Sequence, residues 1–512
     1  MNVRKLTSKI YGNLGEFTLV QPNLYQSSSG RVYLLGNGNP GGKGDGTIFL
    51  DKARGSALAY EVPRSIILCD DFSGIKPQPL SHPQAPVELS QERTTELVNV
   101  IKMLGFKPNI AIRSSAQVED QLGQTAAGVF NTEFHGKALD NEESIKRFIE
   151  KLLSVYNSAY SERAVRFWER LGYFEIPPIS VIIQELVGKQ WKYAPQYFLP
   201  AISGITNTSS RKVVRVATVL GLGLSAVGEK GLGILHKLPI EEDGLRVGSN
   251  IGYFKGDLND SDIWALALEN GNAVHIFGES TAQLFPNHYL KDLCWTFPKI
   301  QMKVADLGLH FEKMIGHPVD IEWASEDGKQ LSLIQIRPIT KKAVIAKPVV
   351  APENIILSSE DVFGQIEREY DLVIVLDSSF LTYRQSEEIE FISKKYPNSL
   401  FIFSTNLKQV HDKVIVEYIL PFADGIIVQD FESDHSLGTT GMQHLALSCS
   451  DDRKSIIYTH SYDLEEKIRA RSRSIERINY SFTGKTTVYK PHQPIRLAAD
   501  DEQDFAMLYF VK

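Results

Sequence analysis

Apolar residues occur along this chain both in short continuous runs and at helical spacing, which predicts a mixture of sheets and helices. Runs rich in β-branched residues predict strands at 110–112, 179–187 and 213–219. Helical spacing of apolar residues predicts helices at 48–59, 92–104, 142–155, 161–171, 260–285 and 299–315. The chain is therefore expected to combine α/β and α+β architecture.

Two polar side chains interrupt apolar runs near residue 330. Glu322 and Gln335 each have an apolar neighbour on both sides, and residues 326–328, Glu-Asp-Gly, form a turn signal between them. Because side chains alternate between the faces of a strand, pairing across this hairpin would project both groups to one side. Arg337, two residues beyond Gln335, is expected on the same face.

The pattern changes after an extended, proline-containing stretch at 343–354, which predicts a linker. Beyond it, strands and a helix alternate, which predicts a second domain of α/β type. The expected strands are 372–376, 400–403, 425–428 and 455–458, with a helix at 386–395.

The size and composition are those of a multidomain soluble protein. A chain of 512 residues is too long for one core, and 43% hydrophobic with 23% charged residues is ordinary for globular proteins. The net charge of −7 argues against a nucleic-acid coat protein, so no nucleic-acid partner is expected. Three scattered cysteines predict neither a disulfide framework nor a zinc site, and no signal peptide or membrane span is evident. We expect a cytoplasmic protein with no membrane partner.

Three segments offer groups that bind phosphate. Lys43 lies in a glycine-rich segment at 36–46, where backbone N–H groups can approach phosphate oxygens. Arg113 follows a short apolar run and offers a planar fork for bidentate phosphate contact. Residues 128–132, Gly-Val-Phe-Asn-Thr, can add backbone amides and one hydroxyl. Together these groups indicate a site that binds a polyphosphate.

Each feature also has a purely structural reading. A Gly-Gly-Lys segment is most often a simple turn, and a buried arginine most often pairs with a carboxylate, here Glu119 or Asp120. The oxygens of Glu322 and Gln335 suit Mg²⁺, but the polar face of an edge hairpin could carry the same residues.

The motifs, taken in order, carry a family resemblance. They are Pro-Gly-Gly-Lys-Gly at 40–44, Val-Pro-Arg at 62–64, Ala-Ile-Arg-Ser-Ser-Ala at 111–116, Ala-Gly-Val-Phe-Asn-Thr at 127–132, Asp-Ile-Glu-Trp at 320–323 and Leu-Ile-Gln-Ile-Arg-Pro at 333–338. This series resembles the ATP-binding domain of the pyruvate phosphate dikinase and phosphoenolpyruvate synthase family, which includes the rifampicin phosphotransferases. That domain is similar to the ATP-grasp fold, and the resemblance covers roughly residues 30–340.

The resemblance implies a site for ATP and Mg²⁺. At matching positions, Gln184 and the backbone at 185–187 would receive the adenine, and Glu322 and Gln335 would hold Mg²⁺. Lys43 and Arg113 would act on the transferred phosphoryl group. The implied ATP-binding residues are Lys43, Arg113, Gly128, Thr132, Gln184, Glu322, Gln335 and Arg337. One departure is Leu224, which stands where the family often has a glutamate, and Glu229 is the nearby acid that could substitute for it.

The resemblance also implies a domain organisation in which an ATP-grasp-like region precedes a smaller, swivelling α/β domain. The expected parts are an N-terminal extension at 1–35, ATP-grasp-like subdomains at 36–200 and 201–342, the linker at 343–354, and a divergent phosphohistidine-like domain at 355–512. The family's phosphoenolpyruvate barrel needs roughly 250 residues, and we expect none here.

Family dikinases pass a phosphoryl group from ATP to a histidine on the swivelling domain. His444, in Gly-Met-Gln-His-Leu-Ala-Leu at 441–447, matches the family's spacing to the next strand, and His435 is the second candidate. A neutral imidazole is nucleophilic, which suits it as a phosphoryl acceptor. Either histidine could instead have an ordinary surface or core role.

These features predict an ATP-dependent phosphotransferase that phosphorylates His444 and hands the group to a small molecule, a protein or a partner subunit. Two alternatives stay open. One is an ATP-dependent ligase that forms an acyl phosphate, and the other is a non-catalytic ATP-binding subunit of a split dikinase system.

Overall fold

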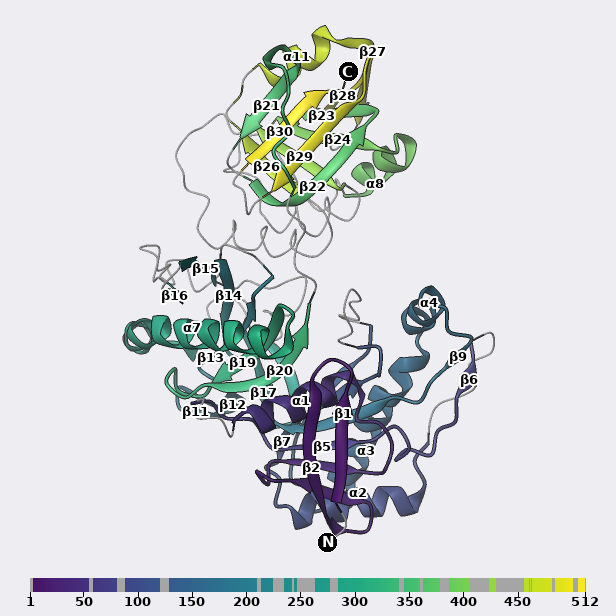
Figure 1. The fold of residues 1–512 in the computed structure, drawn as a ribbon, viewed down its shortest axis with the longest axis vertical. Coiled ribbons are helices and arrows are strands. Elements are labelled where there is room, and N and C mark those ends of the chain that lie inside the picture. The colour runs from purple at the N-terminus through teal and green to yellow at the C-terminus, as the bar shows by residue number, and fades with distance from the viewer. Residues whose placement is uncertain are drawn as a thin grey trace. The chain divides into compact units, whose positions relative to one another are not determined.

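A computed structural model describes residues 3–54, 59–80, 88–119, 129–209, 213–223, 234–241, 244–245, 263–276, 284–339, 345–359, 362–377, 386–404, 423–429, 455–459, 461, 463–480, 484–500 and 505–511. These residues fall into two compact units, formed mainly by residues before 342 and residues after it. Each unit combines sheets and helices (Figure 1), which confirms the expected mixture of α/β and α+β architecture. Over the described parts of the chain, no helix is long and apolar enough to cross a membrane.

The first unit is organised around an eight-stranded sheet. Its strand order is β1 (Val3–Ser8), β2 (Gly12–Gln21), β3 (Leu24–Ser27), β4 (Val32–Leu35), β5 (Ser65–Leu68), β10 (Ser180–Glu185), β7 (Asn109–Ser115) and β8 (Thr132–Gly136). Neighbours are antiparallel except β4 and β5. The segment expected as an N-terminal extension therefore supplies β1 to β4 of this sheet. Its polar sequence fits the exposed edge strand β1, in which exposed and half-buried side chains alternate.

Three helices cover one face of this sheet: α2 (Gln91–Met103), α3 (Glu142–Asn157) and α4 (Glu162–Arg170). Ile112 and Ile183 of the central strands are fully buried in one core with Trp168 of α4. Each helix starts at a residue whose side chain accepts a hydrogen bond from the first turn, namely Ser90, Asn141 and Ser161. The sequence predicted all three helices, and their ends differ by one or two residues.

Two smaller sheets complete most of the first unit. A six-stranded sheet has the order β16 (Gly244–Leu245), β15 (Ile234–Glu241), β14 (Val213–Leu220), β13 (Ile202–Asn207), β19 (Val319–Ser325) and β20 (Ser332–Pro338). A four-stranded sheet has the order β11 (Lys189–Trp191), β12 (Ala194–Leu199), β17 (Ile263–Ala267) and β18 (Asn272–Ile276), and a two-stranded ribbon joins β6 (Gln78–Pro79) to β9 (Glu175–Ile176). The hairpin predicted around residue 330 is confirmed as β19 and β20.

The helix expected at 260–285 is wrong, because that segment contains the antiparallel hairpin of β17 and β18. Gly271 has a positive φ of 68° and donates its N–H to Ala267 O, which closes the turn. The Asn270-Gly271 pair is a standard hairpin signal that the helical spacing of the apolar residues concealed. The helix expected at 299–315 is confirmed as the C-terminal part of α7 (Asn287–Ile315), which also runs through Pro298.

The second unit contains a ten-stranded sheet. Its centre is formed by four parallel strands, β23 (Leu372–Asp377), β24 (Ser399–Ser404), β25 (Gly425–Gln429) and β26 (Ser455–Thr459). Helix α8 (Ser386–Lys395) lies between β23 and β24 in the sequence. The sequence predicted these four strands and this helix. The antiparallel flanks were not foreseen: β21 (Ile355–Ser359), β22 (Val362–Tyr370), β27 (Ser472–Tyr480), β28 (Gly484–Pro491), β29 (Ile495–Asp500) and β30 (Phe505–Phe510), with α11 (Leu464–Ala470).

The stretch expected as a linker packs in part against the second unit. Ile345 donates its N–H to the Asp500 carboxylate at 3.0 Å, and Ile345 and Val350 contact the cluster that contains Phe505. A short 3-10 helix, Pro352–Asn354, then leads into β21.

Candidate functional site

Lys43 lies in the first turn of a helix. The sequence predicted a glycine-rich turn followed by a helix at 48–59, but α1 begins at Gly41 and ends at Arg54. The glycines allow close packing, because a Cβ at Gly41 would lie 1.8 Å from Ser115 O and one at Gly46 would lie 2.5 Å from Ile336 O. Only glycines let this helix approach both β7 and β20 so closely.

Protein acceptors already bind several N–H groups of this first turn. Gly42 N donates to Ala116 O at 3.0 Å, and Gly44 N donates to Ser115 Oγ at 2.9 Å. The segment therefore offers a ligand chiefly the ammonium group of Lys43 rather than the ring of backbone amides that its glycine content indicated.

Lys43 is held by a buried carboxylate. Its Nζ lies 2.5 Å from Glu119 Oε1 and 3.2 Å from Ser114 Oγ. The Glu119 side chain is only 2% exposed, and its other oxygen accepts the N–H of Ala116 at 2.7 Å. Glu119, considered from the sequence as a partner of Arg113, thus pairs with Lys43.

The Arg113 side chain extends from the eight-stranded sheet to β19 and β20 of the six-stranded sheet. It lies within β7, which continues to Ser115, and not at the strand's end as expected. Its Nη2 donates to Glu322 Oε2 at 2.6 Å and to Gln335 Oε1 at 2.5 Å. Glu322 and Gln335 are directly paired on β19 and β20, so the prediction that they project together is confirmed.

Arg337 and Asp320 form the next pair along the same hairpin. Arg337 donates from Nε at 2.9 Å and from Nη2 at 2.7 Å to one oxygen of Asp320, which is 7% exposed. Asp320 belongs to the Asp-Ile-Glu-Trp motif at 320–323, but no role was expected for it from the sequence. Its spacing of two residues from Glu322 was the available signal, because residues two apart on a strand share a face.

The charges of this cluster act on one another. Burial alone would raise the pKa of Glu322, but the positive charges of Arg113, Lys43 and Arg337, with the Arg113 hydrogen bond, lower it overall. Glu322 is therefore ionised at neutral pH. Three cations, Lys43, Arg113 and Arg337, and their carboxylate partners, Glu119, Glu322 and Asp320, are clustered here. Fixed cations beside carboxylate and amide oxygens are suited to a polyphosphate with a metal ion.

Thr132 and Gln184 lie near Arg113 on the sheet. Thr132 is directly opposite Arg113 on β8 and is exposed. Gln184 is buried, and its Nε2 donates to Ser65 Oγ at 3.2 Å and Ile334 O at 3.3 Å. It shares the face of Arg113, since Arg113 pairs with Ile182, two residues before Gln184. Gly128, Leu224, Glu229, His435 and His444 lie outside the described residues.

Glu322 and Gln335 fit a hard cation in their donor chemistry. A carboxylate oxygen and an amide oxygen already hold one cationic nitrogen between them, and Mg²⁺ commonly takes one or two protein oxygens with the rest from phosphate and water. Among the described residues, no cluster of three or more histidine, cysteine or acidic side chains could hold a metal ion. A metal here would thus depend on ligands from the bound nucleotide.

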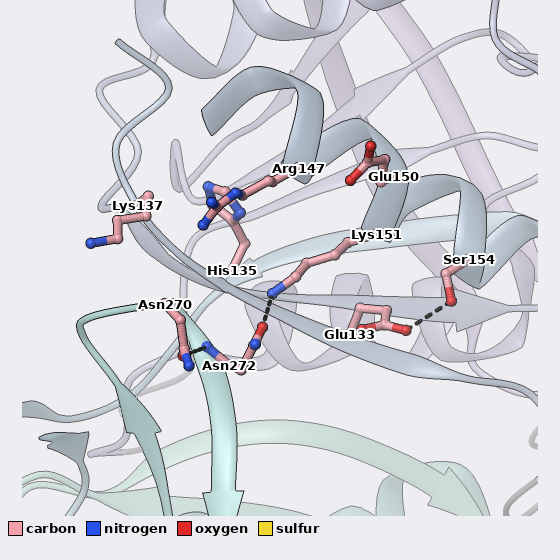
Figure 2. A pocket seen from close by; sticks show the side chains of 9 residues that line it. All are labelled: Glu133, His135, Lys137, Arg147, Glu150, Lys151, Ser154, Asn270 and Asn272. Carbon is pink, nitrogen blue, oxygen red and sulfur yellow. Dashed lines mark hydrogen bonds between the residues drawn. The ribbon is translucent and has the colours of Figure 1, made fainter. Parts of the chain in front are cut away.

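A separate hollow of about 350 Å³ lies between β8, α3 and the β17–β18 hairpin (Figure 2). Lys151 spans it, donating to Asn272 Oδ1 at 2.7 Å, to Gly271 O at 3.1 Å and to Phe134 O. Burial, with the charges of Lys151 and Arg147, lowers the pKa of His135 to about 4. The sequence gave no indication of this cluster, whose contacts fasten the hairpin to β8.

Comparisons with known proteins point to the same region. Residues 78–233 match the family of the pyruvate phosphate dikinase AMP/ATP-binding domain. A probable phosphoenolpyruvate synthase of Methanocaldococcus jannaschii is 25% identical over 242 residues, which cover 45% of this chain and 17% of that protein. The family match includes Arg113, Thr132 and Gln184, whereas Lys43 and the β19–β20 hairpin lie outside it.

Proposed function

Because the ATP-binding region of this chain belongs to the pyruvate phosphate dikinase and phosphoenolpyruvate synthase family, we propose that the protein is an ATP-dependent phosphotransferase of the dikinase type. It binds ATP with Mg²⁺ in the first unit and transfers a phosphoryl group to a histidine in the second. The acceptor that follows is a small molecule, a protein or a partner subunit.

The observation that carries this proposal is the convergence on Arg113. Its guanidinium meets Glu322 and Gln335, which are more than two hundred residues away in the sequence. Lys43 contributes to the field at Glu322 from a third element. Each of the three cations is paired with a carboxylate in the structure, and a triphosphate offers further negative charges that the same cations can bind.

In this function the cations bind phosphate and the two oxygen donors hold the metal. Lys43, Arg113 and Arg337 orient the triphosphate and stabilise negative charge that develops on transfer. Glu322 and Gln335 hold Mg²⁺, which supplies charge neutralisation of the phosphate oxygens when it is bound. Thr132, beside Arg113, adds a hydroxyl donor, and Gly128 adds a backbone amide.

The adenine is received at the end of β10 by Gln184 and the backbone at 185–187. The N–H groups of Glu185 and Leu186 donate to Arg64 O and Asn109 O, so both are engaged within the sheet. The base would therefore interact with the side-chain amide of Gln184 and with backbone groups beyond these two.

His444 is the proposed phosphoryl acceptor. It belongs to the connection between β25 and β26, which are parallel neighbours. That connection leaves from the carboxyl end of β25, the edge of an α/β sheet at which ligands usually bind. In the first half-reaction, ATP, water and the histidine would give phosphohistidine, AMP and inorganic phosphate, because one phosphoryl group goes to the imidazole and the other to water.

The test is the intact mass of the full-length protein after incubation with ATP and Mg²⁺, together with analysis of the released nucleotide. We expect the mass to increase by one phosphoryl group in an acid-labile form, with release of AMP. His444→Asn should abolish the increase, and His435→Asn is the matched control that should retain it.

Three results would overturn the proposal. Release of ADP alone, without a phosphoenzyme, indicates the acyl-phosphate ligase. Binding of ATP without turnover indicates a nucleotide-binding subunit. Phosphorylation that is retained in His444→Asn and lost in His435→Asn reassigns the acceptor.

A further inference from the structure

One nitrogen atom of Arg113 occupies the point where two oxygen donors meet. Nη2 lies 2.6 Å from Glu322 Oε2 and 2.5 Å from Gln335 Oε1. The side chains of Arg113 and Glu322 are 13% and 22% exposed, so the contact is largely shielded from water. Charge-assisted hydrogen bonds of this kind are strong, and they hold the two strands' polar groups in a fixed arrangement.

The same two oxygens are the ones that the proposed function assigns to Mg²⁺, and the inference rests on that assignment. A guanidinium nitrogen and a metal ion cannot occupy the same point, and their charges repel. The Arg113 backbone is fixed, because β7 lies between β10 and β8 in the sheet. Only the side chain can make room.

We propose that Arg113 acts as an internal cation that fills the metal position of the empty site, and that metal-bound ATP enters by exchange. The divalent cation takes over Glu322 and Gln335, and the released guanidinium turns to the phosphates. No covalent bond changes in this step.

The exchange couples the two ligands. Metal alone must displace Arg113 and separate its shielded guanidinium from Glu322. Triphosphate alone must draw Arg113 away, and the Glu322 carboxylate then loses its hydrogen-bonded cation and keeps only the more distant charges of Lys43 and Arg337. When both bind, the metal ion replaces Arg113 as the partner of Glu322, and the triphosphate replaces Glu322 as the partner of Arg113. Metal and nucleotide therefore bind with positive coupling, and the coupling is equal in both directions.

The test measures binding of Mn²⁺ to the full-length protein without nucleotide, from the electron paramagnetic resonance signal of free Mn²⁺. A second titration measures binding of a non-hydrolysable ATP analogue. Arg113→Met, which keeps the side-chain stem and removes the charge, should bind Mn²⁺ alone roughly tenfold more tightly than the wild type and bind the analogue roughly tenfold more weakly. A purely structural role for Arg113 would weaken both.

Three further variants sharpen the result. Arg64→Met is the matched control, because Arg64 forms a similar ion pair with Glu185 at 2.5 Å and does not contact the metal ligands. It should leave Mn²⁺ binding unchanged. Adding Glu322→Gln to Arg113→Met should remove the increase in Mn²⁺ affinity, which would show that the ion binds at Glu322. Arg113→Lys keeps the charge, so its Mn²⁺ affinity should stay close to that of the wild type even if Arg113→Met fails to fold.

Unchanged or weaker Mn²⁺ binding by folded Arg113→Met overturns the inference, as does tight Mn²⁺ binding by Arg113→Lys or by the wild type without nucleotide. The proposed function fails separately, if the wild type binds no ATP analogue or forms no phosphohistidine. If the wild type forms phosphohistidine and Arg113→Met has an unchanged Mn²⁺ affinity, the proposed exchange of Arg113 for the metal is wrong. The proposed phosphotransferase function is then retained.

Discussion

Lys43 and Glu119 form an ion pair in which the Glu119 side chain is 2% exposed and the Lys43 side chain is 18% exposed. Ser114 Oγ and the N–H of Ala116 also donate to this carboxylate. Three donors therefore fix the Glu119 carboxylate, and this buried anion in turn holds the Lys43 ammonium group in place. The pair explains how a long, flexible lysine can have one position before any ligand binds.

The first prediction concerns the energy of this pair. Lys43→Met leaves the Glu119 carboxylate buried with only neutral donors, and we expect it to lower the free energy of unfolding by about 2–3 kcal/mol. Glu119→Gln in the same chain should recover part of that loss, giving a coupling energy of about 1–3 kcal/mol in a double-mutant cycle. All five tryptophans precede residue 342, so tryptophan fluorescence in urea reports the first unit.

The control for this cycle is the pair Lys5 and Glu16, whose side chains are 77% and 61% exposed. Their coupling should be below about 0.5 kcal/mol, because solvent screens exposed charges. Equal coupling in the two cycles would contradict the role assigned to Glu119.

The second prediction concerns the glycines of α1. Gly41 and Gly105 both have positive φ, 76° and 60°, but a Cβ at Gly41 would lie 1.8 Å from Ser115 O whereas one at Gly105 has nothing within 4 Å. Gly105→Ala should lower the free energy of unfolding by about 1–2 kcal/mol, because a residue with a side chain is strained at a positive φ. Gly41→Ala should cost at least about 3 kcal/mol, since a backbone oxygen must shift as well. Urea unfolding of both variants tests this, and equal losses would show that α1 can move away from β7.

Local patterns in the sequence predicted elements well where one physical signal dominated. Apolar runs such as Leu372–Leu376 form buried strands at the parallel centre of a sheet, and helical spacing of apolar residues at 142–155 predicted α3. They failed where two signals competed. The turn at Asn270-Gly271 lies in a segment whose apolar residues have helical spacing, so a helix was predicted where a hairpin forms. The glycines around Lys43 predicted a turn, but they allow a helix to pack closely against neighbouring strands.

Local patterns predicted one part of the candidate site, the shared face of Glu322 and Gln335 on their hairpin, but not the contacts between distant segments. Nothing within β7 indicates that Arg113 meets a hairpin that follows more than two hundred residues later, because the fold of the whole unit brings them together. The family resemblance supplied the residues, whereas the partners of Lys43 and Arg337 required coordinates. The sequence offered Glu119 as a partner of Arg113, and it offered for Asp320 only the spacing of two residues from Glu322. The structure instead places Glu119 beside Lys43 and Asp320 beside Arg337.

The third prediction concerns Lys151 of α3, which donates to two acceptors on the β17–β18 hairpin, Gly271 O and Asn272 Oδ1, and to one on β8, Phe134 O. Lys151→Met keeps the apolar stem but leaves two backbone carbonyls and an amide oxygen without this donor, so we expect a loss of about 1–3 kcal/mol. Hydrogen exchange should accelerate in 263–276 more than in β10. Lys146→Met on the same helix is the control, since its ion pair with Glu150 is exposed and 4.0 Å long and should contribute little. Uniform exchange in the Lys151 variant would mean that it does not fasten the hairpin.

The last prediction is a pH dependence that arises from His135. The folded state lowers the pKa of this histidine to about 4, through burial and the charges of Lys151 and Arg147, from an ordinary value of 6.5. Between these two values the unfolded chain binds a proton that the folded chain does not. Stability is therefore fully present above about pH 6.5 and falls as the pH decreases towards 4, by about 2 kcal/mol between pH 7.5 and pH 5. The measurement is the difference in unfolding free energy between the wild type and His135→Gln across this range, because subtraction cancels the titration of the carboxylates. A flat difference for His135→Gln would mean that the imidazole stays accessible to protons in the folded protein.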